Sequence, residues 1–345
     1  MDQTRAHHPV LYLVIPCYNE EQGLGVCAET LREYFRTTLR ELVSPDSRVL
    51  FVDDGSTDNT WGILQALHAG DTLFEAVRLS RNRGHQMALY AGMMEAKDKA
   101  DCVITIDADL QQDIRVMPQF LAQYSEGCDV VYGIRNSRKT DGFFKRWSAT
   151  LYYKMMRFLG VDLVEQSADY RLLSAQALEE LAEYRESNLF IRGIVPTLGL
   201  KSGAVHFDVR ERTLGTSKYT LRKMTGLAAD GITSFSIRPL RIIMVLGILI
   251  SVASLIKIIH AVWEAYFGTP ISGWASLTVS IWFLGGVNFI ALGIIGEYIG
   301  RTYMESKKRP RYFISDTLLH AGGESVTHDS AGDNAQKDAV PEKES

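Results

Sequence analysis

The sequence predicts an α/β fold: a mostly parallel sheet with helices on both faces, followed by amphipathic juxtamembrane helices and a two-helix membrane hairpin. Short apolar runs alternate with amphipathic segments up to about residue 135, and two long apolar stretches follow residue 239. The 345 residues suffice for one large domain and a smaller unit. A net charge of -4 argues against a nucleic-acid binder that works by phosphate neutralisation.

Five short runs rich in Val, Ile, Leu and Tyr predict strands, and three longer segments with apolar residues at three-to-four spacing predict helices. The strand runs are 10–16, 47–54, 74–80, 101–109 and 128–135, and the helical segments are 20–42, 59–70 and 84–100. Ligands of such sheets bind beyond the carboxyl ends of the strands. The clusters "PCYNEE", "DDGSTDNT", "RNRGHQ" and "DADLQQD" fall there, so we expect them to share one crevice.

An acidic cluster, "IDADLQQD", follows the fourth predicted strand. Asp107 and Asp109 are two residues apart, so they point the same way and can face one cation. Carboxylate oxygens suit Mg²⁺ or Mn²⁺. A pair of catalytic acids and a simple polar turn are the alternatives, and Asp113 is expected to cap the next helix.

The second predicted strand also ends in acids. Asp53 or Asp54 is expected to accept hydrogen bonds from a base or a ribose hydroxyl, while Gly55 allows close approach of the backbone. An N-cap is the alternative use of this turn, because the residues at 56–58 suit the start of a helix near Thr60.

The cysteines carry no metal or disulfide signal. Cys17, Cys27, Cys102 and Cys128 lack CxxC spacing, which favours buried free thiols in a reducing compartment. The N-terminus lacks the apolar core of a signal peptide, so we expect the first part of the chain to stay in the cytosol.

Two stretches, at about 240–265 and 274–300, are long enough to span a membrane. Lys257 and His260 interrupt the first. Lys257 lies roughly 24 Å beyond Arg241 at about 1.5 Å per residue, near the far edge, where it can snorkel. A functional cation inside the membrane is the alternative. Positively charged residues precede the first apolar stretch and follow the second, and the segment that connects the two stretches has none. This distribution predicts a hairpin with both chain termini in the cytosol.

The chain therefore divides into four expected parts. Residues 1–213 form the cytosolic catalytic-type domain, and 214–238 a basic amphipathic segment at the membrane surface, with an ordinary surface helix as its alternative. Residues 239–302 form the membrane hairpin. Residues 303–345 form a cytosolic tail, expected to be disordered after about 318.

The ordered motifs "VIPCYNEE", "VDDGSTDNT", "LSRNRGHQMALYAGM" and "IDADLQQD" resemble the nucleotide-sugar-binding half of family 2 glycosyltransferases, which have the Rossmann-like GT-A fold. "SADYRLLS", "RERTLGTSKY", the two spans and "GEYIGRTY" are similar to the polyprenyl-phosphate glycosyltransferases. Within these, the bacterial bactoprenol (undecaprenyl-phosphate) glucosyltransferases are most similar, and dolichol-phosphate mannose synthase is more distant. The resemblance covers about residues 9–315.

The resemblance implies roles for individual residues. Implied catalytic residues are Asp109, Asp169, Arg171, Arg212 and Lys218. Implied substrate-binding residues are Pro16, Tyr18, Glu20, Asp53, Asp54, Asn82, Gly84, Asp107 and Ser217. Implied ligands of Mg²⁺ or Mn²⁺ are Asp107, Asp109 and Gln111. For Asp169 two roles stay open: a base that deprotonates the acceptor, or a group that positions Arg171, which the carboxylate–arginine spacing favours.

The implied activity is inverting transfer of a hexose from a nucleotide diphosphate sugar to a polyprenyl phosphate at the cytosolic face of the plasma membrane. UDP-glucose is the donor that the resemblance favours, and UDP-GlcNAc, UDP-galactose, GDP-mannose and an aminoarabinose donor stay open. Relatives imply a homo-oligomer, such as a tetramer. A processive polysaccharide synthase and a non-catalytic membrane scaffold are the other classes. A processive synthase needs more membrane spans than the two predicted, and a non-catalytic scaffold leaves the acidic motifs unexplained.

Overall fold

The computed structural model describes residues 8–136, 164, 167–186, 189–208, 238–267 and 273–320. An eight-stranded sheet with the order β7-β5-β6-β4-β1-β2-β3-β8 forms the centre of its α/β domain. The strands are β1 Leu11–Cys17, β2 Arg48–Asp53, β3 Phe74–Leu79, β4 Cys102–Thr105, β5 Val130–Arg135, β6 Ser167–Ser174, β7 Ser202–Phe207 and β8 Ile314–Leu318. The five strands predicted from the sequence are β1 to β5.

Strands β1 to β4 are all parallel, as predicted: β1 lies between β2 and β4, and β3 follows β2. Their residues are almost entirely buried because helices cover both faces, which explains continuous apolar runs rather than alternation. Two strands run against the others, β6 between β4 and β5, and β8 beside β3. The parallel arrangement brings the carboxyl ends of β1 to β4 to one edge of the sheet.

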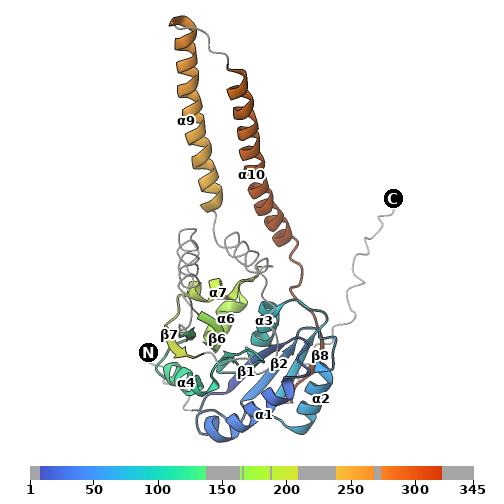
Figure 1. Ribbon diagram of the computed structural model, residues 1–345. Coiled ribbons are helices and arrows are strands. Elements are labelled where there is room, and N and C mark those ends of the chain that lie inside the picture. The colour runs from blue at the N-terminus through green and yellow to red at the C-terminus, as the bar shows by residue number, and fades with distance from the viewer. Residues whose placement is uncertain are drawn as a thin grey trace, which may run out of the picture.

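Each face of the sheet has its own apolar core. Helices α1 (Leu24–Tyr34), α2 (Thr60–Gly70) and α4 (Met117–Ser125) pack on one face. Helices α3 (His85–Ala96), α6 (Ala175–Ala182) and α7 (Ile191–Ile194) pack on the other (Figure 1). Short helical turns η1 Phe35–Leu39, η2 Ile114–Val116 and η3 Val195–Leu198 complete these layers. The predicted α/β class and the helices on both faces are confirmed.

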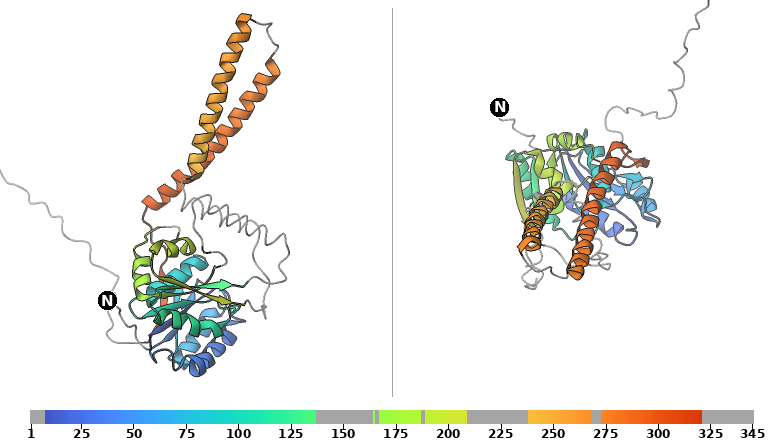
Figure 2. Two further views of the ribbon diagram at one scale, coloured as in Figure 1. Left: turned by 90° about the vertical axis from the view of Figure 1, so that its left-hand side faces the viewer. Right: turned by 90° about the horizontal axis from the view of Figure 1, so that it is seen from above.

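Two long helices, α9 (Arg238–Phe267) and α10 (Trp274–Ser306), stand side by side and project from the side of the domain that carries α3 and α7 (Figures 1 and 2). Many of their apolar side chains are exposed, as Phe289 is at 78%. Within the part of the chain that the structure describes, one stretch, Phe283–Ser306, meets a length and composition test for crossing a membrane. Lys257 lies inside α9, with no break in the helix.

The chain returns to the α/β domain after α10, which the sequence analysis did not predict. Strand β8 pairs antiparallel with β3, and its neighbour Phe313 accepts a hydrogen bond from the Ser80 backbone N–H at 2.9 Å. The His320 backbone N–H then donates to Oε1 of Glu75 at 3.1 Å. Residues that the sequence analysis assigned to a tail therefore complete one edge of the sheet.

All four cysteines are free and buried, which confirms the prediction for them.

Candidate active site

The loops after β1 and β2 are bound together by backbone hydrogen bonds. Asn19, in the left-handed conformation at φ 53°, donates its backbone N–H to Oγ of Ser56 at 2.9 Å. Its side-chain oxygen accepts from the Thr57 backbone N–H, also at 2.9 Å. Tyr18, beside it, is 41% exposed. The two loops are therefore joined, and Tyr18 stays partly exposed beside them.

Asp53 is fully buried at the end of β2. One carboxylate oxygen accepts from the Ser56 backbone N–H at 2.9 Å, and the other lies 3.2 Å from Nε of Arg78. The Arg78 guanidinium in turn lies over the Trp61 ring, 5.6 Å from its centre. Each carboxylate oxygen of Asp53 thus has a contact within the protein, and the positive charge of Arg78 balances the negative charge of the carboxylate.

Asp54 is also buried and holds the loop that leads into α3. Its two oxygens accept backbone hydrogen bonds from Arg83 at 2.7 Å and from Gly84 at 2.8 Å. Burial raises the pKa of Asp54, and these two donors oppose that rise. In this structure both acids, expected to contact a nucleotide, bind backbone and Arg78 instead, and a contact with a base or ribose stays a prediction.

The acidic loop after β4 turns sharply at Leu110. This residue has φ 47°, unusual for a branched apolar side chain, and its N–H donates to the Asp107 carbonyl at 3.2 Å. Asp107 is half-buried and accepts a hydrogen bond from the Gln112 side chain, whereas Asp109 is exposed. The predicted cap is confirmed: Asp113 begins η2 and accepts from the Arg115 backbone N–H at 3.1 Å.

Asp169, on β6, is bound by two arginines. Arg192, from α7, donates through Nε and a terminal nitrogen to the two carboxylate oxygens at 2.9 and 2.8 Å. Arg171 donates to one of the same oxygens at 2.8 Å. Burial alone would raise the pKa of Asp169, but a hydrogen bond with His85 and the two guanidinium charges hold that pKa well below its ordinary range. The carboxylate therefore stays ionised and is a weak base.

His85, the first residue of α3, connects the two acidic groups. Its Nε2 lies 3.5 Å from Oδ1 of Asp107 and 3.5 Å from Oδ2 of Asp169. Burial opposes its charged form, but the hydrogen bond to Asp169 and the charge of Asp107 raise the pKa of His85. The structure thus joins the ends of β4, β6, α3 and α7 in one charged cluster: Asp107, His85, Asp169, Arg171 and Arg192.

His85, Arg192 and Gln112 had no predicted role. His85 stood inside the quoted motif "RNRGHQ", and Gln112 beside Gln111, whose backbone N–H donates to Asp109 at 3.1 Å. Arg192 had no motif signal, because its partner is 23 positions away in the chain. Predicted residues Arg212, Ser217 and Lys218 lie outside the residues that the structure describes.

The loop after β4 has donors that fit a hard divalent cation. Among the described residues no group of three or more His, Cys, Asp or Glu side chains is arranged around a common point. Mg²⁺ and Mn²⁺ need fewer protein ligands, commonly one or two carboxylates, when phosphate oxygens and water supply the rest. Asp107 and Asp109 offer that number. Burial raises the pKa of Asp107, so a bound cation would favour its ionised form.

The remaining predicted residues lie around the same edge. Pro16 is buried within β1, while Glu20 donates its backbone N–H to Oγ1 of Thr60 at 2.9 Å and so joins α2 to the first loop. Asn82 is exposed and Gly84 directly precedes α3. The structure therefore places the described part of the predicted set at the carboxyl ends of β1 and β2, on the loops that follow β1 to β4, or on β6.

Known proteins resemble this chain over most of its length. Residues 12–182 match the glycosyl transferase family 2, and residues 238–302 match the GtrB C-terminal hairpin. A Bacillus subtilis (strain 168) protein, the uncharacterized glycosyltransferase YkoT, is 47% identical over 90% of this chain and 93% of its own. The bactoprenol glucosyl transferase of Shigella phage SfV is 40% identical over 88% of this chain and 97% of its own.

A further relative is the prophage bactoprenol glucosyl transferase homolog of Escherichia coli (strain K12), 39% identical over 88% of this chain and 97% of its own. Among solved structures, mannosyl-3-phosphoglycerate synthase from Rubrobacter xylanophilus has a TM-score of 0.46 at 16% identity, over 64% of this chain and 71% of that one.

The family match and these relatives show a glycosyltransferase whose catalytic domain is the α/β domain described above. The chain belongs to glycosyl transferase family 2 and carries the C-terminal hairpin of the GtrB type.

Proposed function

We propose that this enzyme transfers a hexose, with inversion, from a nucleotide diphosphate sugar to the phosphate of a polyprenyl phosphate at the cytosolic face of the membrane. UDP-glucose and undecaprenyl phosphate are the proposed donor and acceptor, and the product is a lipid-linked sugar for cell-envelope glycosylation. The observation that carries the proposal is the charged cluster at the carboxyl edge of the sheet, in a chain 39–40% identical to a bactoprenol glucosyl transferase and a bactoprenol glucosyl transferase homolog.

The reaction forms one bond and breaks one. An oxygen of the acceptor phosphate attacks the anomeric carbon of the sugar, and the bond from that carbon to the nucleotide's β-phosphate oxygen breaks. The nucleotide diphosphate leaves with the bonding electrons and gains negative charge. Groups that stabilise this developing charge lower the barrier most. A divalent cation held by Asp107 and Asp109, with Gln111 nearby, would supply that stabilisation.

The acceptor needs little help from a base. A phosphate monoester has a second pKa near ~6, so most of it is dianionic at neutral pH. Asp169 is ion-paired with two arginines, and its pKa is held low. Both facts support a positioning role: Asp169 orients Arg171 and Arg192, and the Arg192 side chain is one-third exposed.

The membrane hairpin serves the acceptor. A polyprenyl chain stays in the bilayer because each buried CH₂ is worth roughly 0.8 kcal/mol, so the enzyme must work at the lipid headgroups. We propose that α9 and α10 both span the membrane, with both chain termini in the cytosol, and that 214–238 lies on the membrane surface. A homo-oligomer, such as a tetramer, remains part of this proposal.

The test is a transfer assay with the full-length protein in proteoliposomes that contain undecaprenyl phosphate. Labelled UDP-glucose, UDP-GlcNAc, UDP-galactose and GDP-mannose are compared, and the lipid products are identified by mass. We expect hexose on the lipid phosphate from UDP-glucose, and loss of transfer in EDTA with recovery in excess Mg²⁺ or Mn²⁺. Transfer from another donor would correct the sugar. Absence of any lipid product would overturn the function, and full activity in EDTA would remove the metal.

A further inference from the structure

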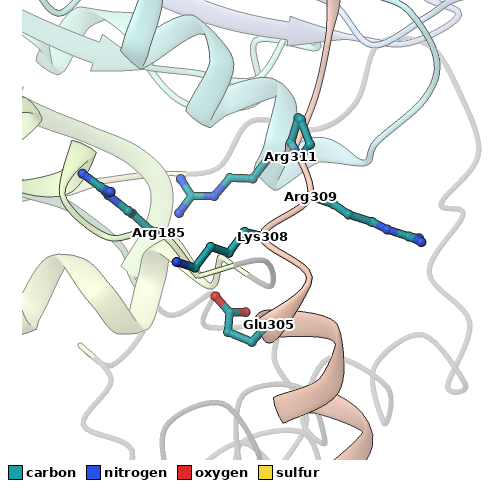
Figure 3. A pocket seen from close by; sticks show the side chains of 6 residues that line it. Arg185, Glu305, Lys308, Arg309 and Arg311 are labelled. Carbon is teal, nitrogen blue, oxygen red and sulfur yellow. The ribbon is translucent and has the colours of Figure 1, made fainter. Parts of the chain in front are cut away.

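A basic pocket lies where the chain leaves α10 and rejoins the α/β domain (Figure 3). Its volume is about 440 Å³, within the roughly 300–1,000 Å³ of small-molecule sites. It is lined by Arg185, Glu305, Lys308, Arg309, Pro310 and Arg311. The site proposed for sugar transfer uses none of these residues.

Arg311 is fixed at the base of this pocket. Its Nε donates to the Glu186 carbonyl at 2.9 Å, and a terminal nitrogen donates to the Tyr184 carbonyl. Its guanidinium also lies over the Tyr90 ring, 4.7 Å from the ring centre. A guanidinium has five N–H donors, so these two bonds hold the group in place and leave donors for an anion.

Lys308 and Arg185 add positive charge beside Arg311. Lys308 has φ 45°, and its side chain extends toward the same side as Arg311 and Arg185, whereas Arg309 points away (Figure 3). Among the described residues, Arg185 and Lys308 form no ion pair. Two acids lie near the pocket: Glu305 lines it, and Glu186 has a pKa raised by burial and by Glu305. The cations outnumber the acids, so an anion would balance the site.

We propose that this pocket binds the phosphate of an anionic phospholipid headgroup in the cytosolic leaflet. Glu305, which lines the pocket, lies at the C-terminal end of the candidate span Phe283–Ser306. With α10 inserted in the bilayer, the pocket would therefore lie at the level of the lipid headgroups. Basic residues next to a span attract anionic lipids. Here the phosphate would join α10 to the domain through Arg185 and Arg311. The inference rests on the proposed membrane insertion of α10.

The test is native mass spectrometry of the full-length protein released from bilayers of equal phosphatidylglycerol and phosphatidylcholine. Lipid adducts are compared for the natural protein, the double variant Arg185→Gln/Lys308→Gln, and Lys307→Gln. Lys307 is the matched control, because it has the same charge and a neighbouring position but lies over the Tyr303 ring at 4.1 Å. We expect preferential retention of phosphatidylglycerol, a loss of that preference by roughly fivefold or more in the double variant, and no change for the control.

Each other outcome contradicts the proposal. Equal loss in Lys307→Gln would mean that general basicity, not the pocket, attracts the lipid. No preference in the natural protein would remove the site. Inorganic phosphate at millimolar concentration should leave the lipid bound, and displacement by it would assign the pocket to a free anion. The same preparation is assayed for sugar transfer: an active enzyme without lipid preference overturns only this site, and an inactive enzyme with the preference overturns only the proposed function.

Discussion

Asp107 and Asp109 lie in the same short loop but have different surroundings. The Asp107 side chain is half-buried, lies next to His85 and accepts a hydrogen bond from Gln112. The Asp109 side chain is exposed. If both hold a cation, both are needed for transfer, yet their loss should affect the folded state differently, because a partly buried hydrogen-bonded group contributes more to stability.

We predict that Asp109→Ala lowers sugar transfer by roughly 100-fold or more, with a change in unfolding free energy within about 0.5 kcal/mol. Transfer kinetics and chemical denaturation measure the two effects. Asp98→Ala is the matched control, since Asp98 is an exposed acid paired only with the surface residue Lys97 among the described contacts. Normal transfer by Asp109→Ala would remove Asp109 from the catalytic set.

The ion pairs of Asp169 allow a prediction about the free energy of unfolding and its dependence on pH. Arg171 is 3% exposed at its side chain, so Asp169→Asn leaves a buried charge with a weaker partner. We expect a loss of about 3–5 kcal/mol at pH 7.

The sign of the pH dependence follows from the lowered pKa of Asp169. The unfolded state takes up a proton near pH ~4, before the folded state does, so this contribution is present above that pH and is lost below it. The stability difference between the natural protein and Asp169→Asn should therefore shrink as pH falls from 6 toward 3. A constant difference in urea titrations across that range would contradict the assignment.

At the scale of the element, the contact between the loops after β2 and β3 requires a glycine at position 55. Gly55 has φ 69°, and a Cβ there would meet the Arg81 carbonyl carbon at 2.7 Å. The loops after β2 and β3 therefore touch through backbone, with no space for a side chain.

We predict that Gly55→Ala destabilises the domain by about 2–4 kcal/mol, through backbone strain together with the steric clash. Gly199→Ala is a matched control, because Gly199 has the same φ of 69° and nothing within 4 Å of an added Cβ. Gly199→Ala should be destabilised only by the backbone strain, by about 1 kcal/mol. Equal destabilisation of the two variants, measured by thermal unfolding, would show that the loop can move apart.

Strand β8 makes the region after the hairpin part of the sheet. Without it, β3 would become an edge strand with unpaired backbone groups. Tyr312 also packs edge-on against Tyr90 of α3, with ring centres 6.4 Å apart.

A chain that ends after Pro310 should therefore unfold at a lower temperature and be cleaved faster by protease within β3, whereas a chain that ends after His320 keeps β8 and should behave as full length. Both are compared in the same detergent. An unchanged unfolding temperature for the shorter chain would mean that β8 adds no stability.

At the scale of the whole molecule, the four cysteines report on global unfolding. All are buried, and burial raises the pKa of Cys27 to about 12. A thiol reagent needs both access and thiolate. We predict that the native protein leaves all four thiols unmodified over an hour at pH 8, and that all four react in denaturant. Modification of Cys27 in the native state, mapped by peptide mass, would indicate local opening of α1.

The sequence alone determined the strands β1 to β5, the helices α1, α2 and α3, the acidic loop ends and the two long apolar helices. Apolar periodicity and turn residues are local properties, so they can be recognised without knowing the fold. The same holds for the Asp113 cap, whose bond spans two residues.

Only the tertiary structure decided which charges far apart in the chain meet, whereas the Asp169–Arg171 pair was predicted from its spacing. Asp169 lies 23 residues before Arg192 in the chain. His85 belongs to α3, which precedes β4, yet it contacts Asp169 of β6, which follows β4. It also decided that Asp53 and Asp54 point into the protein, and that β8 returns to β3 across 235 or more positions. Such contacts depend on chain topology and on competition for buried partners, which no local pattern of residues records.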